Sequence, residues 1–159
     1  MGNYFFRRLS NETYEVMNNP SGFNSEIVDS SVTYAIGNDG NLYKYSNSTN
    51  NFALFYTPSS PLPTNNKTSI TVHSDRIFIN STSTTSVWLY AYLIESSGLT
   101  EVLNFTKDVF FIDPEVEASP QLTKVFVVGN GNTTNTSKAI GYAFHIDWSA
   151  KTVEDIIFP

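Results

Sequence analysis

Short runs of hydrophobic and aromatic residues alternate with clusters of Gly, Pro, Asn and Ser along the whole chain. The runs are rich in β-branched and aromatic residues, and none has the 3.6-residue apolar spacing of an amphipathic helix. Short strands divided by turns at such intervals are typical of an all-β protein. We therefore predict fourteen strands, over residues 4–10, 13–17, 26–29, 32–37, 42–46, 52–57, 69–73, 76–80, 87–95, 100–105, 109–113, 124–130, 139–147 and 152–158.

The segments between these runs predict two kinds of connection. Residues 58–67 and 114–121 contain prolines, which cannot donate to a strand ladder, so both segments are predicted to be connectors. The Asp39-Gly40 pair and the Ser96-Ser97-Gly98 stretch have the residues that tight hairpin turns favour. Residues 80–86 and 129–138 are polar and are predicted to be longer loops of the same kind.

The predicted strands fall into groups of four that follow one plan. Ile36 and Ile79, 43 residues apart, occupy equivalent places, and Val127 follows Ile79 by 48 residues. A period of this length fits one four-stranded unit. The chain length predicts a single domain over residues 1–159. Its repeat units are predicted at 26–57, 69–105 and 109–158, preceded by a half unit at 3–17.

The repeats resemble β-propeller units in the segments IGNDGNLYKY (36–45), VWLYAYLIESSGLTEV (87–102) and AIGYAFHIDWSAKTVEDI (139–156). The first is similar to a turn of pyrroloquinoline-quinone-type units, and the others are similar to the third and fourth strands of lactonase-type blades. The resemblance implies about three and a half four-stranded antiparallel blades, whereas closed propellers have about four to eight. The predicted fold class is all-β, antiparallel and propeller-like, with a β-sandwich or jelly roll as the alternative.

Two of the predicted strands have large apolar residues at both odd and even positions. These are residues 87–94 and 139–144, whereas a sheet with one wet face alternates apolar and polar residues. The pattern predicts sheets that are covered on both faces. Stacked blades fit it, and so do the inner strands of a sandwich that has a partner on its outer face.

Composition narrows the class of partner. The net charge is −6 and the basic residues are scattered, so a nucleic-acid partner is not expected. The chain has no cysteine and no run of 18 apolar residues, so we expect no disulfides and no membrane insertion. The sequence starts without a secretory signal pattern, and if the protein is exported we expect that signal to have been removed.

Seven Asn-x-Ser/Thr sequons point to N-glycosylation and to an extracellular, cell-surface or virion-surface location. Six of the seven have Thr at the third position, and most lie in turn-like stretches where a glycan can be tolerated. The alternative is that a chain rich in Ser, Thr and Asn forms such patterns by chance. The predicted glycosylation sites are Asn11, Asn47, Asn66, Asn80, Asn104, Asn132 and Asn135.

No catalytic or cofactor motif stands out. His73 and His145 lie within apolar strands without neighbouring ligands, so both are interpreted as structural imidazoles. Asp113, Glu115 and Glu117 could bind Ca²⁺ through oxygen ligands, but they lack the order of a calcium loop and read better as a solvated acidic segment. We therefore expect no metal, no cofactor and no enzyme activity. A lactonase-like enzyme is a third, weaker hypothesis.

Two hypotheses for function remain. The first is a structural subunit that self-associates into a homo-oligomer or filament, as part of a fibre, surface layer or coat, since unpaired β-units present edges and faces to neighbours. The second is a module that recognises carbohydrate or another ligand. Trp148, in a turn with polar neighbours, is the candidate for stacking on a sugar ring, although it could equally cover an apolar edge of the sheet.

Overall fold

The computed structural model describes residues 5–8, 14–17, 23–26, 34–46, 48–49, 51–64, 68–83, 86–108, 112–133 and 136–156. The chain divides into two compact units, residues 1–66 and residues 67–159. All the elements in the described ranges are strands, and no helix there is long and apolar enough to span a membrane. The all-β, antiparallel class is confirmed, whereas a single domain over 1–159 stays a prediction.

Unit 1 contains two sheets whose strands pair in chain order. The first is the hairpin β1 (Phe5–Arg8) and β2 (Tyr14–Met17). The second is a four-stranded antiparallel sheet of β3 (Phe23–Glu26), β4 (Tyr34–Gly37), β5 (Leu42–Ser46) and β6 (Asn51–Tyr56). Ala35, Tyr45 and Phe52 pack on one face of this sheet, with the Tyr45 and Phe52 rings 5.4 Å apart.

Unit 2 contains two further antiparallel sheets of four strands, again paired in chain order. Sheet A, as we call it, consists of β7 (Ser69–His73), β8 (Arg76–Thr82), β9 (Ser86–Glu95) and β10 (Gly98–Asp108). Sheet B consists of β11 (Ile112–Ala118), β12 (Lys124–Thr133), β13 (Thr136–Asp147) and β14 (Thr152–Ile156). The repeat-like grouping in fours is therefore present in the structure. Each of the fourteen predicted strands shares residues with an observed one, but the predicted strand 26–29 shares only Glu26 with β3, and its other residues lie outside the described ranges.

Three predicted loops are wrong in part. Residues 114–118 belong to β11 rather than to a connector, because Pro114 lies on an edge strand at a shift of register between Ile112 and Glu115, where a missing N–H is tolerated. Residues 80–82 continue β8, and residues 129–133 and 136–138 continue the β12–β13 hairpin. The polar side chains of these stretches did not prevent ladder pairing.

The turn at residues 38–41 forms as predicted. Gly40 has φ +76°, and the Gly40 amide donates to the Gly37 carbonyl at 2.9 Å. The Asp39 carboxylate accepts hydrogen bonds from the Asn41 amide and from the Tyr43 hydroxyl, at 3.1 and 2.7 Å. Partial burial raises the pKa of Asp39, but these hydrogen bonds outweigh it and hold the pKa below the ordinary value.

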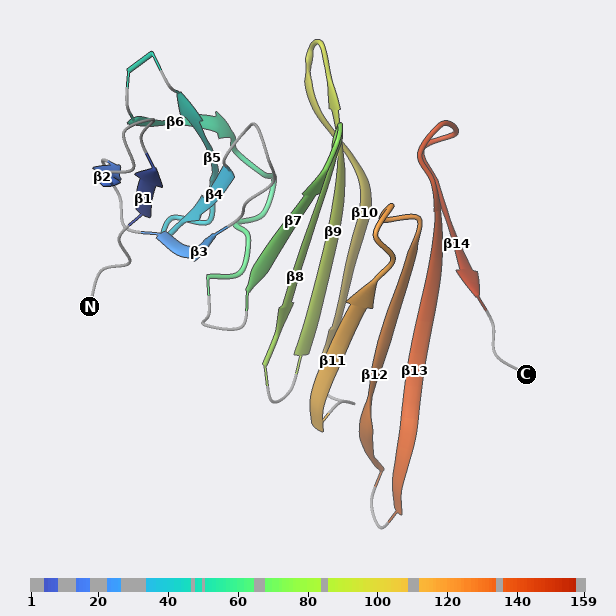
Figure 1. Ribbon diagram of the computed structural model, residues 1–159. Coiled ribbons are helices and arrows are strands. Elements are labelled where there is room, and N and C mark those ends of the chain that lie inside the picture. Colours follow the sequence, from blue (N-terminus) through green and yellow to red (C-terminus); the bar gives the residue numbers. More distant parts are fainter. Residues whose placement is uncertain are drawn as a thin grey trace. The chain divides into compact units, whose positions relative to one another are not determined.

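Sheets A and B pack face to face around the core of unit 2 (Figure 1). Strand β8 of sheet A contacts β11 of sheet B, and β10 contacts β14, so the strands follow the same order in both sheets. Phe105 of sheet A packs against Phe144 of sheet B with ring centroids 4.9 Å apart. The buried residues of this core are Phe78, Val87, Leu89, Ala91, Leu103, Leu122, Val125, Val127, Phe144, Ile146 and Trp148.

Burial on both faces, predicted from the apolar run at 87–94, is confirmed for the central strands of sheet A. In β8, Phe78 points into the core shared with sheet B, while Ile77 and Ile79 on the opposite face are 0% exposed. In β9, Ala91 and Tyr92 alternate in the same way and are both 0% exposed.

Candidate functional site

Turns from both sheets of unit 2 meet at one end of the stack. Figure 1 shows the β7–β8, β9–β10, β11–β12 and β13–β14 connections at this end, with the β8–β9 and β12–β13 hairpins at the other. The Arg76 guanidinium donates to the Gln121 carbonyl at 2.9 Å, which joins the β7–β8 turn to the β11–β12 connection. The Lys151 ammonium lies 2.7 Å from Glu95 Oε1, which joins the β9–β10 and β13–β14 turns. Turns at equivalent places in the two sheets therefore contact each other.

Trp148, the residue predicted to stack on a sugar, lies in the β13–β14 turn but is only 6% exposed. Its indole N–H donates to the Leu122 carbonyl at 3.2 Å, and the Arg76 guanidinium lies 5.3 Å from its ring centroid. A ligand ring needs an exposed aromatic face, which this geometry does not offer. Trp148 instead covers the apolar end of the core, the alternative reading of the sequence.

The ion pair between Glu95 and Lys151 lies at the surface. The hydrogen bond from Lys151, followed by that from the Thr100 hydroxyl, lowers the pKa of Glu95. Because both side chains remain solvated, such a pair contributes little to stability.

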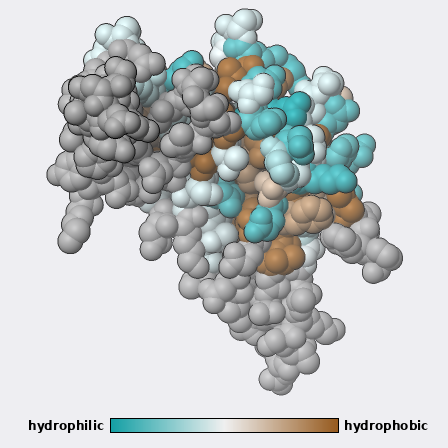
Figure 2. Space-filling model, viewed as in Figure 1, coloured by the Kyte–Doolittle hydropathy of each residue, from teal (hydrophilic) through white to brown (hydrophobic). Residues whose placement is uncertain are grey.

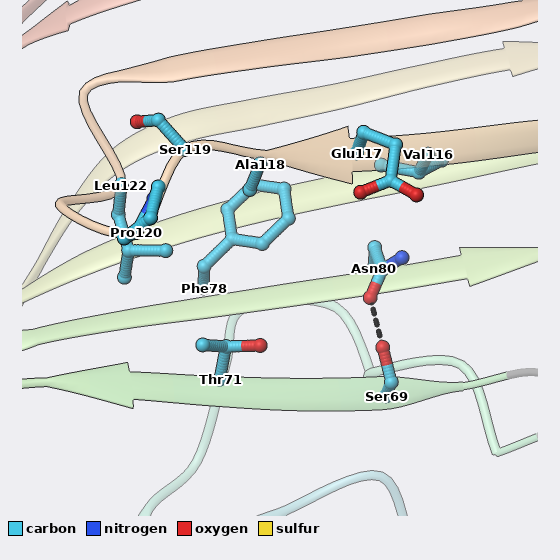
Figure 3. A pocket seen from close by; sticks show the side chains of 10 residues that line it. All are labelled: Ser69, Thr71, Phe78, Asn80, Val116, Glu117, Ala118, Ser119, Pro120 and Leu122. Atoms are coloured by element: carbon cyan, nitrogen blue, oxygen red, sulfur yellow. Dashed lines mark hydrogen bonds between the residues drawn. The ribbon is translucent and has the colours of Figure 1, made fainter.

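A pocket of about 220 Å³ opens where β7 extends beyond the cover of sheet B (Figure 3). Figure 3 shows Ser69, Thr71 and Asn80 on the sheet A side and Glu117 on the sheet B side, with Phe78 between them. The Ser69 hydroxyl donates to the Asn80 amide oxygen. The hydroxyl, amide and carboxylate groups of this lining can hydrogen-bond a small polyhydroxy ligand, whereas Phe78 is 2% exposed and offers no open ring face. The lining is completed by Val116, Ala118, Ser119, Pro120 and Leu122.

The acidic segment shows only part of its geometry. Glu117 is exposed on β11, while the side chains of Asp113 and Glu115 lie outside the described residues. Across the part of the chain that the structure describes, no three potential ligands gather into a metal site. His73 and His145 lie in strands β7 and β13, as predicted, and the absence of a cofactor stays a prediction.

Two of the seven sequons have described side chains, and their surroundings differ. Asn104 is exposed on β10, an edge strand, and its third residue Thr106 is exposed too. Asn80 lies in the inner strand β8 at the pocket, and Ser81 and Thr82 after it are 0% and 8% exposed. The side chains of the remaining five, Asn11, Asn47, Asn66, Asn132 and Asn135, lie outside the described residues.

We expect Asn104 to carry glycan and Asn80 to carry none when the chain is produced in a eukaryotic secretory pathway. A glycan on Asn80 would have to leave through the pocket, whereas Asn104 already faces solvent. Peptide mapping after enzymatic deglycosylation measures occupancy at each asparagine, and Asn104→Gln is the control for assignment. Full occupancy at Asn80 with none at Asn104 would contradict the expected pattern.

The face of sheet B that points away from sheet A is open to solvent. It carries Phe126 (39% exposed), Val128 (54%) and Ile156 (36%), three of the four large apolar side chains found exposed in the described residues. Figure 2 shows hydrophobic residues at the surface of unit 2 between polar ones. We call these three residues, with Ala143 between Phe126 and Ile156, the open face of sheet B.

The open face was not predicted from the sequence, although the sequence carries a signal for it at residues 125–128. The run Val125-Phe126-Val127-Val128 is apolar at both parities, like residues 87–94, and this pattern predicts cover on two sides. In the structure only the Val125 and Val127 side is covered. Comparison of the chain with protein-family models and with curated proteins finds no match.

Proposed function

We propose that the chain is a non-enzymatic structural subunit, which assembles through its β-sheet surfaces into a fibre, surface layer or coat. The observation that carries this proposal is the contrast between the two sheets of unit 2. The central strands of sheet A are buried on both faces, whereas sheet B, built on the same plan, leaves Phe126, Val128 and Ile156 exposed. Exposed apolar sheet faces of this kind mark sites of association.

A propeller-like arrangement of the repeats is part of the proposal. It is supported by the shared strand order of the two sheets and by the contacts between equivalent turns, which a repeated step from sheet to sheet would produce. Repeats of this kind add further sheets in the same direction. The sandwich alternative fits the same face-to-face core and the same turn contacts.

The proposed location is extracellular, at a cell or virion surface, and rests on the seven sequons. Light scattering coupled to size exclusion tests the assembly proposal, and intact mass of the secreted chain tests the location. We expect a particle mass above 17.8 kDa that rises with concentration, and glycan mass on the monomer. A compact monomer at every concentration would end the assembly proposal.

The second candidate function is carbohydrate recognition, favoured by the polar lining of the pocket at Ser69, Thr71, Asn80 and Glu117. A glycan array with the purified chain tests it. We expect Thr71→Val and Glu117→Gln to remove any signal, since both residues line the pocket and are exposed. Trp148→Phe is the control that should leave the signal unchanged, and a chain that binds no glycan on the array removes this candidate.

A further inference from the structure

The open face of sheet B repeats, position by position, the face of sheet A that sheet B covers. Two backbone hydrogen bonds fix the equivalence: the Ile94 amide donates to the Asp75 carbonyl at 2.6 Å, and the Ile146 amide donates to the Thr123 carbonyl at 2.8 Å. Asp75 is thus equivalent to Thr123, and Ile94 is equivalent to Ile146.

When the two sheets are aligned by these equivalent residues, an apolar row of sheet A matches an apolar row of sheet B. Phe78 pairs with Ala91, which pairs with Leu103, and all three belong to the buried core between the sheets. Their equivalents in sheet B are Phe126, Ala143 and Ile156, which pair in the same way.

The two rows differ mainly in whether a neighbouring sheet covers them. Phe78 and Leu103 are 2% and 6% exposed, whereas Phe126 and Ile156 are 39% and 36% exposed. The alanine between them is buried in both rows. In sheet A this row is therefore covered by a neighbouring sheet, whereas the equivalent row in sheet B has no cover.

We propose that the open face of sheet B binds the same face of a second copy of this chain, in a twofold-symmetric dimer. This inference rests on the proposed function and names the surface and the partner. An isologous contact needs only one surface, and the remaining large exposed apolar residue of the described chain, Leu54, stands alone on β6 in unit 1. In this dimer each open face is covered by the open face of the other copy, and not by the Val125 and Val127 side that sheet B presents to sheet A.

The charges on the open face include one pair that is complementary across a twofold axis, Lys124 and Glu154, beside two further carboxylates on the same face, Glu117 and Asp147. Lys124 on β12 and Glu154 on β14 lie on the same face as Phe126, because His145 pairs with both and lies two residues after Ala143. A twofold axis that runs along the strands between β12 and β13 brings Lys124 of one copy next to the Glu154 edge of the other. Two such contacts of opposite charge flank the apolar row and fix its orientation.

The size of the face sets the strength of the dimer. Four strands about 4.8 Å apart and about five residues long give a face of roughly 19 by 17 Å, so two faces bury on the order of 700 Å². This is below the roughly 1,200 Å² at which stable interfaces start. The dimer is therefore concentration-dependent, and it must be measured over a wide range of concentrations.

The test is sedimentation equilibrium of the full chain from about 5 to about 500 µM, a range that brackets weak association. For the native chain we expect the mass to rise from 17.8 kDa toward twice that value. Phe126→Thr combined with Val128→Thr removes the apolar row but keeps residues that favour strands, and is expected to raise the Kd at least about tenfold. Leu54→Thr is the matched control, an exposed apolar residue outside the face, and should leave the Kd unchanged.

A charge exchange gives a second readout that does not depend on the double variant being folded. Lys124→Glu alone should weaken the dimer, and so should Glu154→Lys alone, while a mixture of the two should associate as well as the native chain. An assembly whose Kd is unaltered by the double variant and by both charge variants would overturn this inference and leave the proposed function standing. A native chain that stays monomeric over the whole range would overturn both.

Discussion

Replacing Trp148 with alanine is expected to lower the free energy of unfolding of unit 2 by about 3–5 kcal/mol, the range for loss of a large buried aromatic side chain. Trp148 is 6% exposed and closes the end of the core between the two sheets. Its removal also leaves the Leu122 carbonyl without the indole donor and Arg76 without the ring on which it lies. The substitution thus loses packing and a polar contact together.

Denaturant unfolding followed by tryptophan fluorescence measures this change, because Trp88 remains as a reporter and both tryptophans of the chain lie in unit 2. Trp148→Phe is the control: it keeps most of the packing and loses the indole N–H, so a cost of about 1–2 kcal/mol is expected. A loss below 1 kcal/mol for Trp148→Ala would show that the indole contributes little to the core.

The position of Leu122 explains why Trp148 matters at this point. Leu122 has φ +57°, a backbone conformation that costs a branched residue energy, and yet its side chain is 1% exposed within the core. Its amide donates to the Ser119 carbonyl at 2.7 Å, and its own carbonyl accepts from Trp148. The strained turn is stabilised by the two contacts that the β11–β12 and β13–β14 connections provide.

Trp148 also shows how far local sequence reasoning reaches. Its polar neighbours Asp147 and Ser149 predicted a turn, which is correct, and an exposed ring, which is not. Phe144, Ile146 and Trp148 share one parity, and the first two point into the core. The alternation of the strand continues into the turn and directs Trp148 inward, so parity was the better guide than the identity of the neighbours.

The strand pattern could be predicted because each strand carries its own signal. Residues 87–95 and 139–147 were placed almost correctly from β-branched and aromatic content alone. The ends of strands depend on their neighbours instead. Asn80 and Asn132 are polar residues that typically end strands, and they continue β8 and β12 because the partner strands β9 and β13 supply matching ladder groups.

The pocket and the open face could not be predicted from single segments. The pocket forms because β11 packs against β8 and leaves the sheet B side of β7 uncovered, and β8 and β11 start 36 residues apart in the chain. The apolar run at 125–128 predicts cover on both faces, but only the structure shows that one face lacks it. The exposure of a strand's side chains depends on whether another sheet packs against them, and this cannot be predicted from the sequence of that strand alone.

Gly40→Ala is expected to destabilise unit 1 by about 3 kcal/mol or more. Two effects contribute to this cost: the backbone conformation of Gly40 and the contacts that an added Cβ would make. Gly40 has φ +76°, which costs an alanine about 1–3 kcal/mol. An added Cβ would also lie 2.6 Å from Pro61 Cβ and 2.9 Å from the Leu62 amide nitrogen. The Leu62 amide donates to the Gly40 carbonyl at 3.0 Å and the Leu62 side chain is 2% exposed, so the 58–64 connector cannot move away without losing both contacts.

Hydrogen exchange at the Leu62 amide and along β5 measures the effect, because both tryptophans lie in unit 2 and fluorescence does not report on unit 1. Gly98→Ala isolates the conformational cost, since Gly98 has φ +133° and open space around its Cβ position. Gly141→Ala has neither problem, with its nearest contact at 3.5 Å, and is expected to be close to neutral. Unchanged protection of Leu62 in Gly40→Ala would mean that the connector does not pack on this turn. A loss no larger than that of Gly98→Ala would assign the whole effect to the backbone conformation and none to the contact with Pro61 and Leu62.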